Sequence, residues 1–112
     1  MPRSQKQKGS RVEREIVKLF TDLGYQARRQ PLSGALQQFP HDVYIADLLG
    51  GTTAEVKARK DGKGFTQLEN WKGTAELLIL KRNNATPFVC MDWKYFKELL
   101  HDRKEYEDHN KS

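Results

Sequence analysis

The Gly50-Gly51 pair, which separates two segments with β-strand character, is the feature that most limits how this chain can fold. Residues 42–49 precede the pair and residues 52–58 follow it. Two such segments joined by a glycine pair predict a β-hairpin with a two-residue turn. The sequence therefore predicts two neighbouring antiparallel strands between residues 42 and 58.

A two-residue turn also decides which side chains of the hairpin share a face. It places Ala46 opposite Glu55, and Tyr44 opposite Lys57. Because side chains alternate along a strand, Asp42 then shares a face with Glu55 and Lys57. A β-bulge would shift this register, so the prediction depends on an unbroken ladder.

Hydrophobic spacing and turn residues predict the remaining elements. A helix is expected over residues 10–23, where Val12, Ile16, Leu19, Phe20 and Leu23 fall at helical spacing, with Gly24 as its terminator. We further expect a short strand over residues 25–29, a loop over 30–41, a helix over 65–72, strands over 76–80 and 87–91, and a final helix capped by Asp92. This order predicts an α/β (α+β) fold with a mixed β-sheet flanked by helices.

The length of 112 residues corresponds to one small domain. We expect a flexible basic arm over residues 1–9, a folded domain over residues 10–100 and a charged tail over residues 101–112. No segment approaches the roughly 18 apolar residues of a membrane span, and no apolar stretch typical of a secretory signal follows the basic start. The single Cys90 excludes an internal disulfide. These features predict a cytoplasmic protein that does not associate with a membrane.

Positive charge is concentrated near the start of the chain. The net charge is +5 and the isoelectric point is near 9.4. Residues 1–30 hold eight Lys or Arg residues against three acids. A basic segment of this kind attracts phosphate at long range, although many small proteins are basic without binding nucleic acid.

The shared face of the predicted hairpin suggests a chemistry. Mg²⁺ prefers oxygen ligands, which the Asp42 and Glu55 carboxylates and the Val56 carbonyl would supply. A cation held there would stabilise charge on a phosphate and help to generate hydroxide. Lys57 would then hold or activate the attacking water. The competing interpretation is a surface salt bridge between Glu55 and Lys57 on a solvated strand.

An ordered set of motifs resembles the PD-(D/E)xK nuclease superfamily. The set comprises Lys8-Gly9-Ser10-Arg11-Val12-Glu13-Arg14-Glu15, then Arg29, Ser33-Gly34, Asp42-Val43 and Glu55-Val56-Lys57. Over residues 8–92 it more narrowly resembles the archaeal-type Holliday junction resolvases and their phage relatives. The resemblance implies a restriction-endonuclease-like core. It also implies a homodimeric, Mg²⁺-dependent endonuclease, with Mn²⁺ able to substitute, that acts on branched or double-stranded DNA in the cytoplasm of its own cell or of a phage host.

The resemblance also implies roles for single residues. Glu13 would be the acid carried by the first helix near the metal, Asp42 and Glu55 would be metal ligands, and Lys57 would be the catalytic lysine. The implied DNA contacts are Lys8, Arg11, Arg14, Arg29, Ser33 and Lys60. Two departures from the superfamily pattern are His41, which stands where a proline is expected, and the long loop between Ser33 and Asp42.

Glu13 has a second explanation that needs no active site. Ser10 and Glu13 have the spacing of a capping box, in which Glu13 would accept a hydrogen bond from the Ser10 amide. His41 has two explanations as well, as a general base or as a loop histidine held by a hydrogen bond.

Other functions compete with a junction resolvase. The same core occurs in nicking, repair and restriction-like nucleases, and a basic arm and helix would also suit a DNA-binding module without catalysis. An assembly protein without a nucleic-acid role is the third class. Acids that face phosphate repel it unless a cation lies between them, and this favours a nuclease over a simple binding module.

Overall fold

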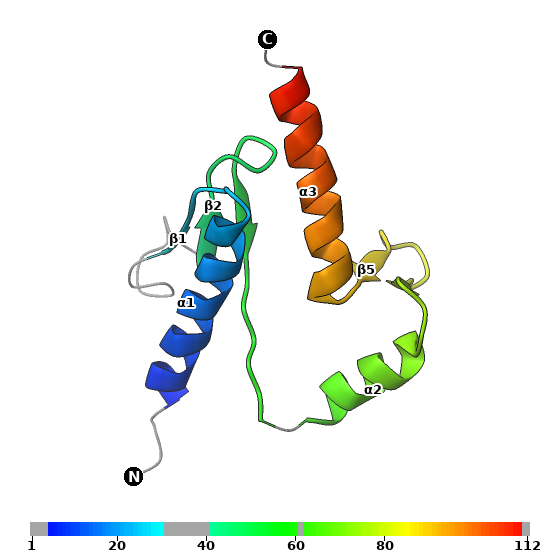
Figure 1. Ribbon diagram of the computed structural model, residues 1–112. Coiled ribbons are helices and arrows are strands. Elements are labelled where there is room, and N and C mark those ends of the chain that lie inside the picture. Colours follow the sequence, from blue (N-terminus) through cyan, green and yellow to red (C-terminus); the bar gives the residue numbers. More distant parts are fainter. Residues whose placement is uncertain (1–4, 31–40, 61, 111–112) are drawn as a thin grey trace. The chain divides into compact units, whose positions relative to one another are not determined.

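The computed structural model describes residues 5–30, 41–60 and 62–110, with the backbone alone for residues 5–9. The chain divides into two compact units, Met1–Arg59 and Lys60–Ser112, and each is described by itself. The first unit contains helix α1 (Gln5–Asp22) and strands β1 (Ala27–Arg29), β2 (Val43–Ile45) and β3 (Thr52–Ala54) (Figure 1). The second contains helix α2 (Lys63–Lys72), strands β4 (Leu78–Leu80) and β5 (Phe88–Cys90), and helix α3 (Trp93–His109).

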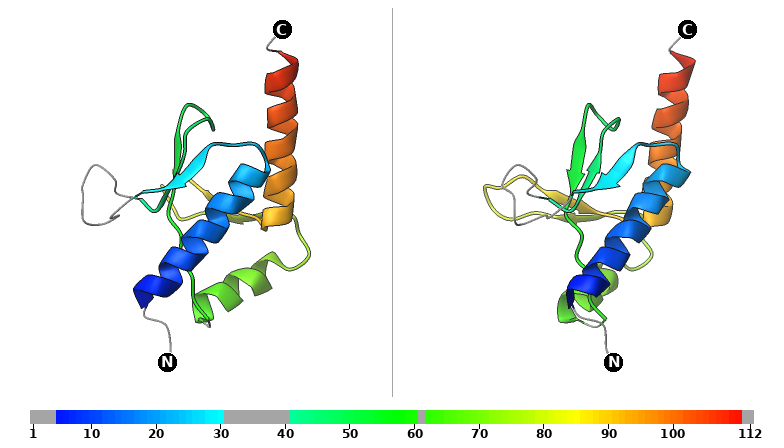
Figure 2. Two further views of the ribbon diagram at one scale, coloured as in Figure 1. Left: turned by 60° about the vertical axis from the view of Figure 1, so that its left-hand side comes forward. Right: turned by 90° about the vertical axis from the view of Figure 1, so that its left-hand side faces the viewer.

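In the first unit, α1 covers one face of an antiparallel sheet with the strand order β1-β2-β3 (Figure 2). Val43 and Ile45 of β2 are fully buried. Phe20 of α1 and Tyr25 are almost entirely buried. Burial of each large apolar side chain contributes roughly 1.5–3 kcal/mol. The alternation of buried and half-buried residues along β2 shows that its other face is turned away from this core.

The start of α1 differs from the sequence prediction. The helix begins at Gln5, so residues 5–9, which were expected in a flexible arm, form its first turns. Ser10 consequently lies inside the helix and is not its N-cap. The end of α1 is as predicted, because Gly24 follows it with a positive φ of 93° and its amide donates to the Thr21 carbonyl.

The second unit packs α2 against β4, which pairs with β5 in antiparallel register. As predicted, Asp92 caps α3: its side chain accepts a hydrogen bond from the Tyr95 amide, and this bond lowers the pKa of the Asp92 carboxyl. α3 continues to His109, whereas the sequence prediction ended it near residue 100 and left a charged tail.

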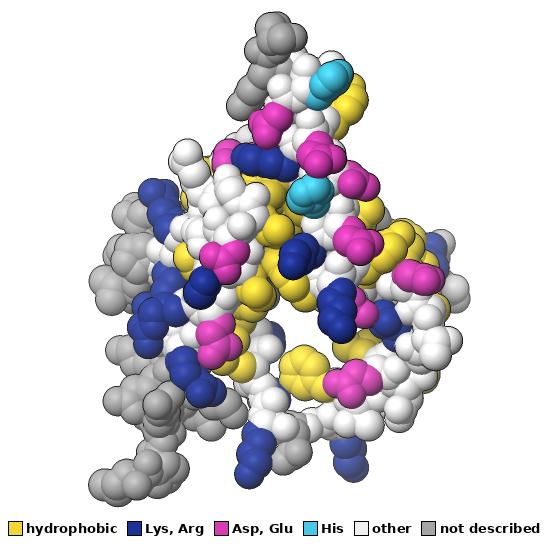
Figure 3. Space-filling view, viewed as in Figure 1, with side chains coloured by type: hydrophobic (Ala, Val, Ile, Leu, Met, Phe, Trp, Pro, Cys, Tyr) yellow, Lys and Arg dark blue, Asp and Glu magenta, His cyan; other side chains and the backbone are white. Residues whose placement is uncertain are grey.

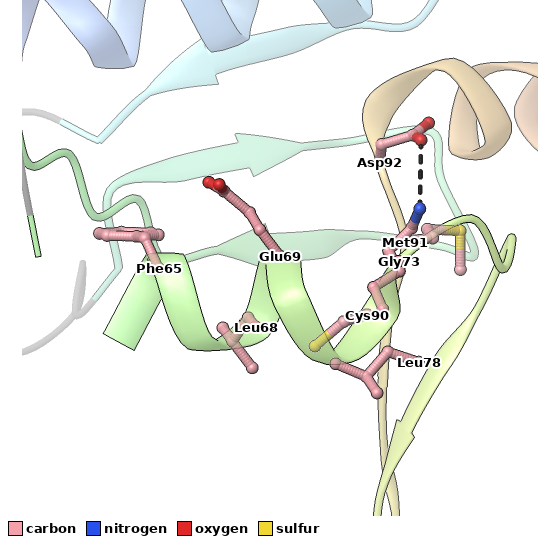
Figure 4. A pocket seen from close by; sticks show the side chains of 9 residues that line it. Phe65, Leu68, Glu69, Gly73, Leu78, Cys90, Met91 and Asp92 are labelled. Carbon is pink, nitrogen blue, oxygen red and sulfur yellow. Dashed lines mark ion pairs between the residues drawn. The ribbon is translucent and has the colours of Figure 1, made fainter. Parts of the chain in front are cut away.

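An apolar pocket of about 350 Å³ lies within the second unit (Figure 4). Phe65 and Leu68 of α2 line it together with Leu78 of β4, Cys90 and Met91. At its edge, the Lys72 ammonium lies 3.6 Å from the Asp92 carboxylate and links α2 to the start of α3.

The fold class is therefore mixed α/β, as expected, but the strands are arranged differently from the prediction. The described strands form two separate antiparallel sheets, of three and two strands, and not one mixed sheet. No helix in the described part of the chain has the length and apolar character needed to cross a membrane.

Candidate active site

The hairpin of β2 and β3 carries the predicted acids, but in another register. Val43 pairs with Ala54 and Ile45 with Thr52, so the predicted pairs of Ala46 with Glu55 and Tyr44 with Lys57 are wrong. The connection between the strands has six residues instead of two. The register of the paired residues is shifted by four, an even number, so within the ladder each side chain keeps its assigned face. Asp42, Glu55 and Lys57 lie beyond the paired residues, and the Asp42 amide donates to the carbonyl of Ala54, which already pairs with Val43.

Asp42 lies directly beside the segment that follows β3. Its amide donates to the Ala54 carbonyl at 3.2 Å, and its Oδ2 accepts from the Val56 amide at 2.8 Å. The carboxylate thus replaces a backbone carbonyl as the acceptor at the end of the ladder. This bond fixes an acid of one strand against Glu55-Val56-Lys57 of the next.

The Glu55 carboxylate is held from two sides. The Lys57 ammonium lies 3.2 Å from its Oε2, and the His41 Nδ1 lies 3.5 Å from its Oε1. The Glu55 side chain is 46% exposed, so solvent and a ligand can reach the group. The Glu55–Lys57 salt bridge expected in the simpler interpretation is therefore present, and it places the ammonium next to an acid of the candidate site.

Glu13 is held in a different way from the predicted capping box. The Arg29 Nε donates to Glu13 Oε1 at 3.1 Å, and its Nη2 donates to the Ser10 hydroxyl at 3.0 Å. The Glu13 side chain is only 16% exposed. Since Arg29 reaches α1, it lies on the face of the sheet that α1 covers.

The neighbours of Arg29 in β1 lie on the opposite face. The Arg28 guanidinium stacks on the Tyr44 ring at 5.2 Å from its centroid, which confirms that these paired residues share a face. The amide of Gln30 donates to the Asp42 carbonyl at 2.9 Å and extends the pairing of β1 and β2 by one residue. Gln30 and Asp42 are therefore opposite one another.

The structure does not gather all the predicted acids at one point. Among the described residues, three possible metal ligands meet within 4.8 Å of one another on the exposed surface of α3. They are His101, Asp102 and Glu105. Glu13, Asp42 and Glu55 do not form such a trio. Each of them is engaged by its own neighbour, as described above.

The predicted DNA contacts are spread over both units. Arg11 and Arg14 are exposed on α1, and Figure 3 shows basic side chains along the edge of the molecule that carries this helix. Lys60 is exposed at the start of the second unit. Lys8 lies in α1 with its side chain outside the described part, and Ser33 lies outside the described residues.

Comparison with known families assigns the chain to a family. A family model described as archaeal Holliday junction resolvase (hjc) matches residues 4–108, which is nearly the whole sequence. The match confirms the resemblance that the ordered motifs indicate. No solved structure matches the chain.

Proposed function

This chain belongs to the archaeal Holliday junction resolvase family, and we propose that it cuts branched DNA at a site built on Asp42, Glu55 and Lys57. Resolvases of this family are metal-dependent, structure-selective DNA endonucleases, and membership implies a restriction-endonuclease-like fold. The observation that carries the proposed site is the 2.8 Å bond from the Val56 amide to the Asp42 carboxylate. It joins the acid of β2 to the Glu55-Val56-Lys57 segment.

The donor set suits a hard divalent cation, and Mg²⁺ is the one we propose, with Mn²⁺ able to replace it. Asp42 and Glu55 provide carboxylate oxygens and Val56 a carbonyl, whereas sulfur and imidazole ligands would be expected for a softer metal. When bound, such a cation stabilises charge on the scissile phosphate and lowers the pKa of a bound water.

The roles of the protein groups follow from their positions. Val56 keeps the Asp42 carboxylate oriented through its amide. Lys57 neutralises Glu55 in the structure described here, and we propose that it holds the attacking water when DNA is bound, since an ammonium donates hydrogen bonds but does not coordinate a cation. Water adds across one P–O bond, which gives a phosphate monoester and a hydroxyl.

Glu13 stays in the proposal as the acid contributed by α1, in a positioning role. Its ion pair with Arg29 lies on the face that α1 covers, and Arg29 is one row from Asp42 in the pairing of β1 and β2. Arg29 thereby connects α1 to β1, the strand that ends directly before Gln30. Of the proposed DNA contacts Lys8, Arg11, Arg14, Arg29, Ser33 and Lys60, the exposed Arg11 and Arg14 are the best placed to meet phosphate along α1.

We also propose that two copies of the chain form a homodimer. A four-way junction must be nicked at two related places, and a two-fold dimer supplies two sites. The second unit presents apolar surface that a partner copy would cover: Ile79 and Val89, paired across β4 and β5, are 52% and 53% exposed. Leu77, just before β4, is 40% exposed as well.

Light scattering of wild type and of the Ile79→Lys variant tests the dimer. We expect a dimer at micromolar concentration that dissociates in the variant. A wild-type protein that is monomeric and is destabilised by Ile79→Lys would show instead that this surface packs within one chain.

The function itself is tested with a four-way junction and a linear duplex of matched sequence, each with and without Mg²⁺. We expect paired nicks in the junction only, and only with Mg²⁺. Equal cutting of the duplex would indicate a restriction-like or repair nuclease. Binding without cutting in either Mg²⁺ or Mn²⁺ would indicate a module without catalysis. We also propose that the protein acts in the cytoplasm.

A further inference from the structure

Gln30 is a buried polar residue that the candidate site does not yet include. It is 8% exposed, and among the described residues it is the polar one that is buried. Its Oε1 has no hydrogen-bond partner within the described structure. Leaving a buried amide oxygen without a donor opposes folding, so an acceptor of this kind suggests a ligand that is missing from the free chain.

The face of the sheet on which Gln30 lies is the first clue to that ligand. Arg29 faces α1, where it contacts Glu13 and Ser10, so alternation turns Gln30 to the other face. By the same alternation, that face also carries Arg28 and Tyr44, which stack on one another.

The pairing of the strands then places Gln30 beside the acids. Its amide donates to the Asp42 carbonyl at 2.9 Å, so the two residues are opposite one another. The segment that follows β3 lies on the other side of Asp42, whose Oδ2 accepts from the Val56 amide at 2.8 Å. Gln30 and Asp42 thus lie beside the Glu55-Val56-Lys57 segment at one end of the sheet.

We infer that the Gln30 side-chain oxygen belongs to the divalent cation site of Asp42 and Glu55, where it accepts a hydrogen bond from the hydrated cation. A neutral amide oxygen suits this role, because Mg²⁺ keeps several waters that must donate to nearby acceptors. The unpartnered oxygen of the free protein is then satisfied when the cation binds. This inference rests on the cation site proposed above.

The test is metal affinity measured by calorimetry with Mg²⁺, and by electron paramagnetic resonance with Mn²⁺, in the absence of DNA. Gln30→Met keeps the length of the side chain and removes the oxygen. We expect its affinity for either cation to fall about tenfold or more, as for other groups around a metal site. Gln26→Met, an exposed glutamine at the start of the same segment, is the matched control and should bind as wild type does.

Thermal unfolding gives a second readout. Without metal, Gln30→Met should melt at the same temperature as wild type or higher, because the variant no longer buries an unsatisfied oxygen. With saturating Mg²⁺, the rise in melting temperature should be smaller than in wild type, since weaker binding stabilises the folded state less. Gln30→Glu should show the reverse: a lower melting temperature without metal, from repulsion by Asp42 and Glu55, and a larger rise with metal.

The outcomes separate this inference from the site on which it rests. If Asp42→Asn loses metal binding while Gln30→Met and Gln30→Glu bind as wild type does, Gln30 is not part of the site. If none of the three changes metal affinity, the proposed cation site itself is wrong. A Gln30→Met variant that is destabilised without metal and keeps full affinity would show that Gln30 has a structural role only.

Discussion

Arg29 and Glu13 form an ion pair with an Nε–Oε1 distance of 3.1 Å, and this pair ties β1 to α1. The same guanidinium reaches the Ser10 hydroxyl, so a single side chain contacts two successive turns of the helix. The pair is half-buried, whereas the Lys18–Asp22 pair at the end of α1 is largely exposed. Burial reduces the screening of charges by water, so the half-buried pair should contribute more to stability than the exposed pair.

We predict a larger coupling energy for the half-buried pair. A double-mutant cycle with Glu13→Ala and Arg29→Ala, measured by urea unfolding, should give about 1 kcal/mol. The same cycle for Lys18 and Asp22 should give roughly 0.3 kcal/mol, as is typical of exposed pairs on a helix. Equal couplings in the two cycles would show that Arg29 does not hold α1 to the sheet through Glu13.

The second prediction concerns the acids. Asp42→Asn and Glu55→Gln should each reduce junction cleavage at least about a hundredfold and keep junction binding, since a bound cation contributes several kcal/mol to the transition state. Glu15→Gln, an exposed acid of α1, is the control and should cut normally. Near wild-type cleavage by either site variant in saturating Mg²⁺ would remove that residue from the proposed site.

Much of this site could be predicted from the sequence, and the reasons are specific. The closeness of Asp42 to the Glu55-Val56-Lys57 segment follows from the predicted hairpin in spite of its wrong register, and the bond from the Val56 amide to Asp42 Oδ2 shows this closeness. The error itself came from the turn. The glycine pair predicts a two-residue connection, but the loop also includes Leu48. Leu48 is buried, and its carbonyl accepts from the Thr52 hydroxyl and from the Gly51 amide.

Other features depend on contacts that local patterns do not encode. The capping-box spacing of Ser10 and Glu13 was a sound local signal, but Arg29, sixteen residues from Glu13, binds both side chains. The prolines and glycine after Arg29 predict a loop from residue 30, and this prediction does not reveal the pairing of Gln30 with Asp42. The length of α3 could have been found, because Arg103 and Glu107 have the four-residue spacing of a helical ion pair and lie 3.0 Å apart. Figure 3 shows both signs of charge along this helix.

The third prediction separates chemistry from metal binding. Lys57→Ala should abolish cleavage while Mg²⁺ affinity, measured by calorimetry, falls only slightly, because an ammonium is not a metal ligand. Loss of its charge next to Glu55 also removes a competing cation, so a collapse of metal affinity is not expected. Arg59→Ala, an exposed base two residues later, serves as the control. A parallel collapse of metal affinity and activity in Lys57→Ala would make the role of Lys57 structural.

The fourth prediction assigns DNA affinity to α1. Arg11→Gln and Arg14→Gln should each weaken junction binding and reduce the slope of log affinity against log salt by about 0.9, the value expected for one phosphate contact on duplex DNA. Cleavage of bound junction should persist. Lys97→Gln, an exposed base of α3, should leave the slope unchanged. An unchanged slope in both α1 variants would mean that this helix does not touch phosphate.

The fifth prediction tests the hairpin connection. Gly50 and Gly51 both have positive φ, of 75° and 123°, but only Gly51 meets a neighbour: a Cβ there would lie 2.6 Å from the Tyr44 hydroxyl. Gly50→Ala should cost about 1 kcal/mol of unfolding free energy. Gly51→Ala should cost about 2 kcal/mol more, since the Tyr44 ring must move. Equal losses, measured by urea unfolding, would contradict the close approach of Tyr44.

Through the bond from the Val56 amide, the proposed catalytic carboxylate of Asp42 also completes the sheet. Substitutions at position 42 would therefore be limited by two separate requirements. A descendant of this chain that had lost cleavage, and kept only the ability to grip a junction, would still need an acceptor of the same reach to close the ladder. Asparagine meets that need, while alanine removes the acceptor and glutamate extends it. In such an inactive lineage we expect asparagine at position 42, whereas position 57 would accept many different residues.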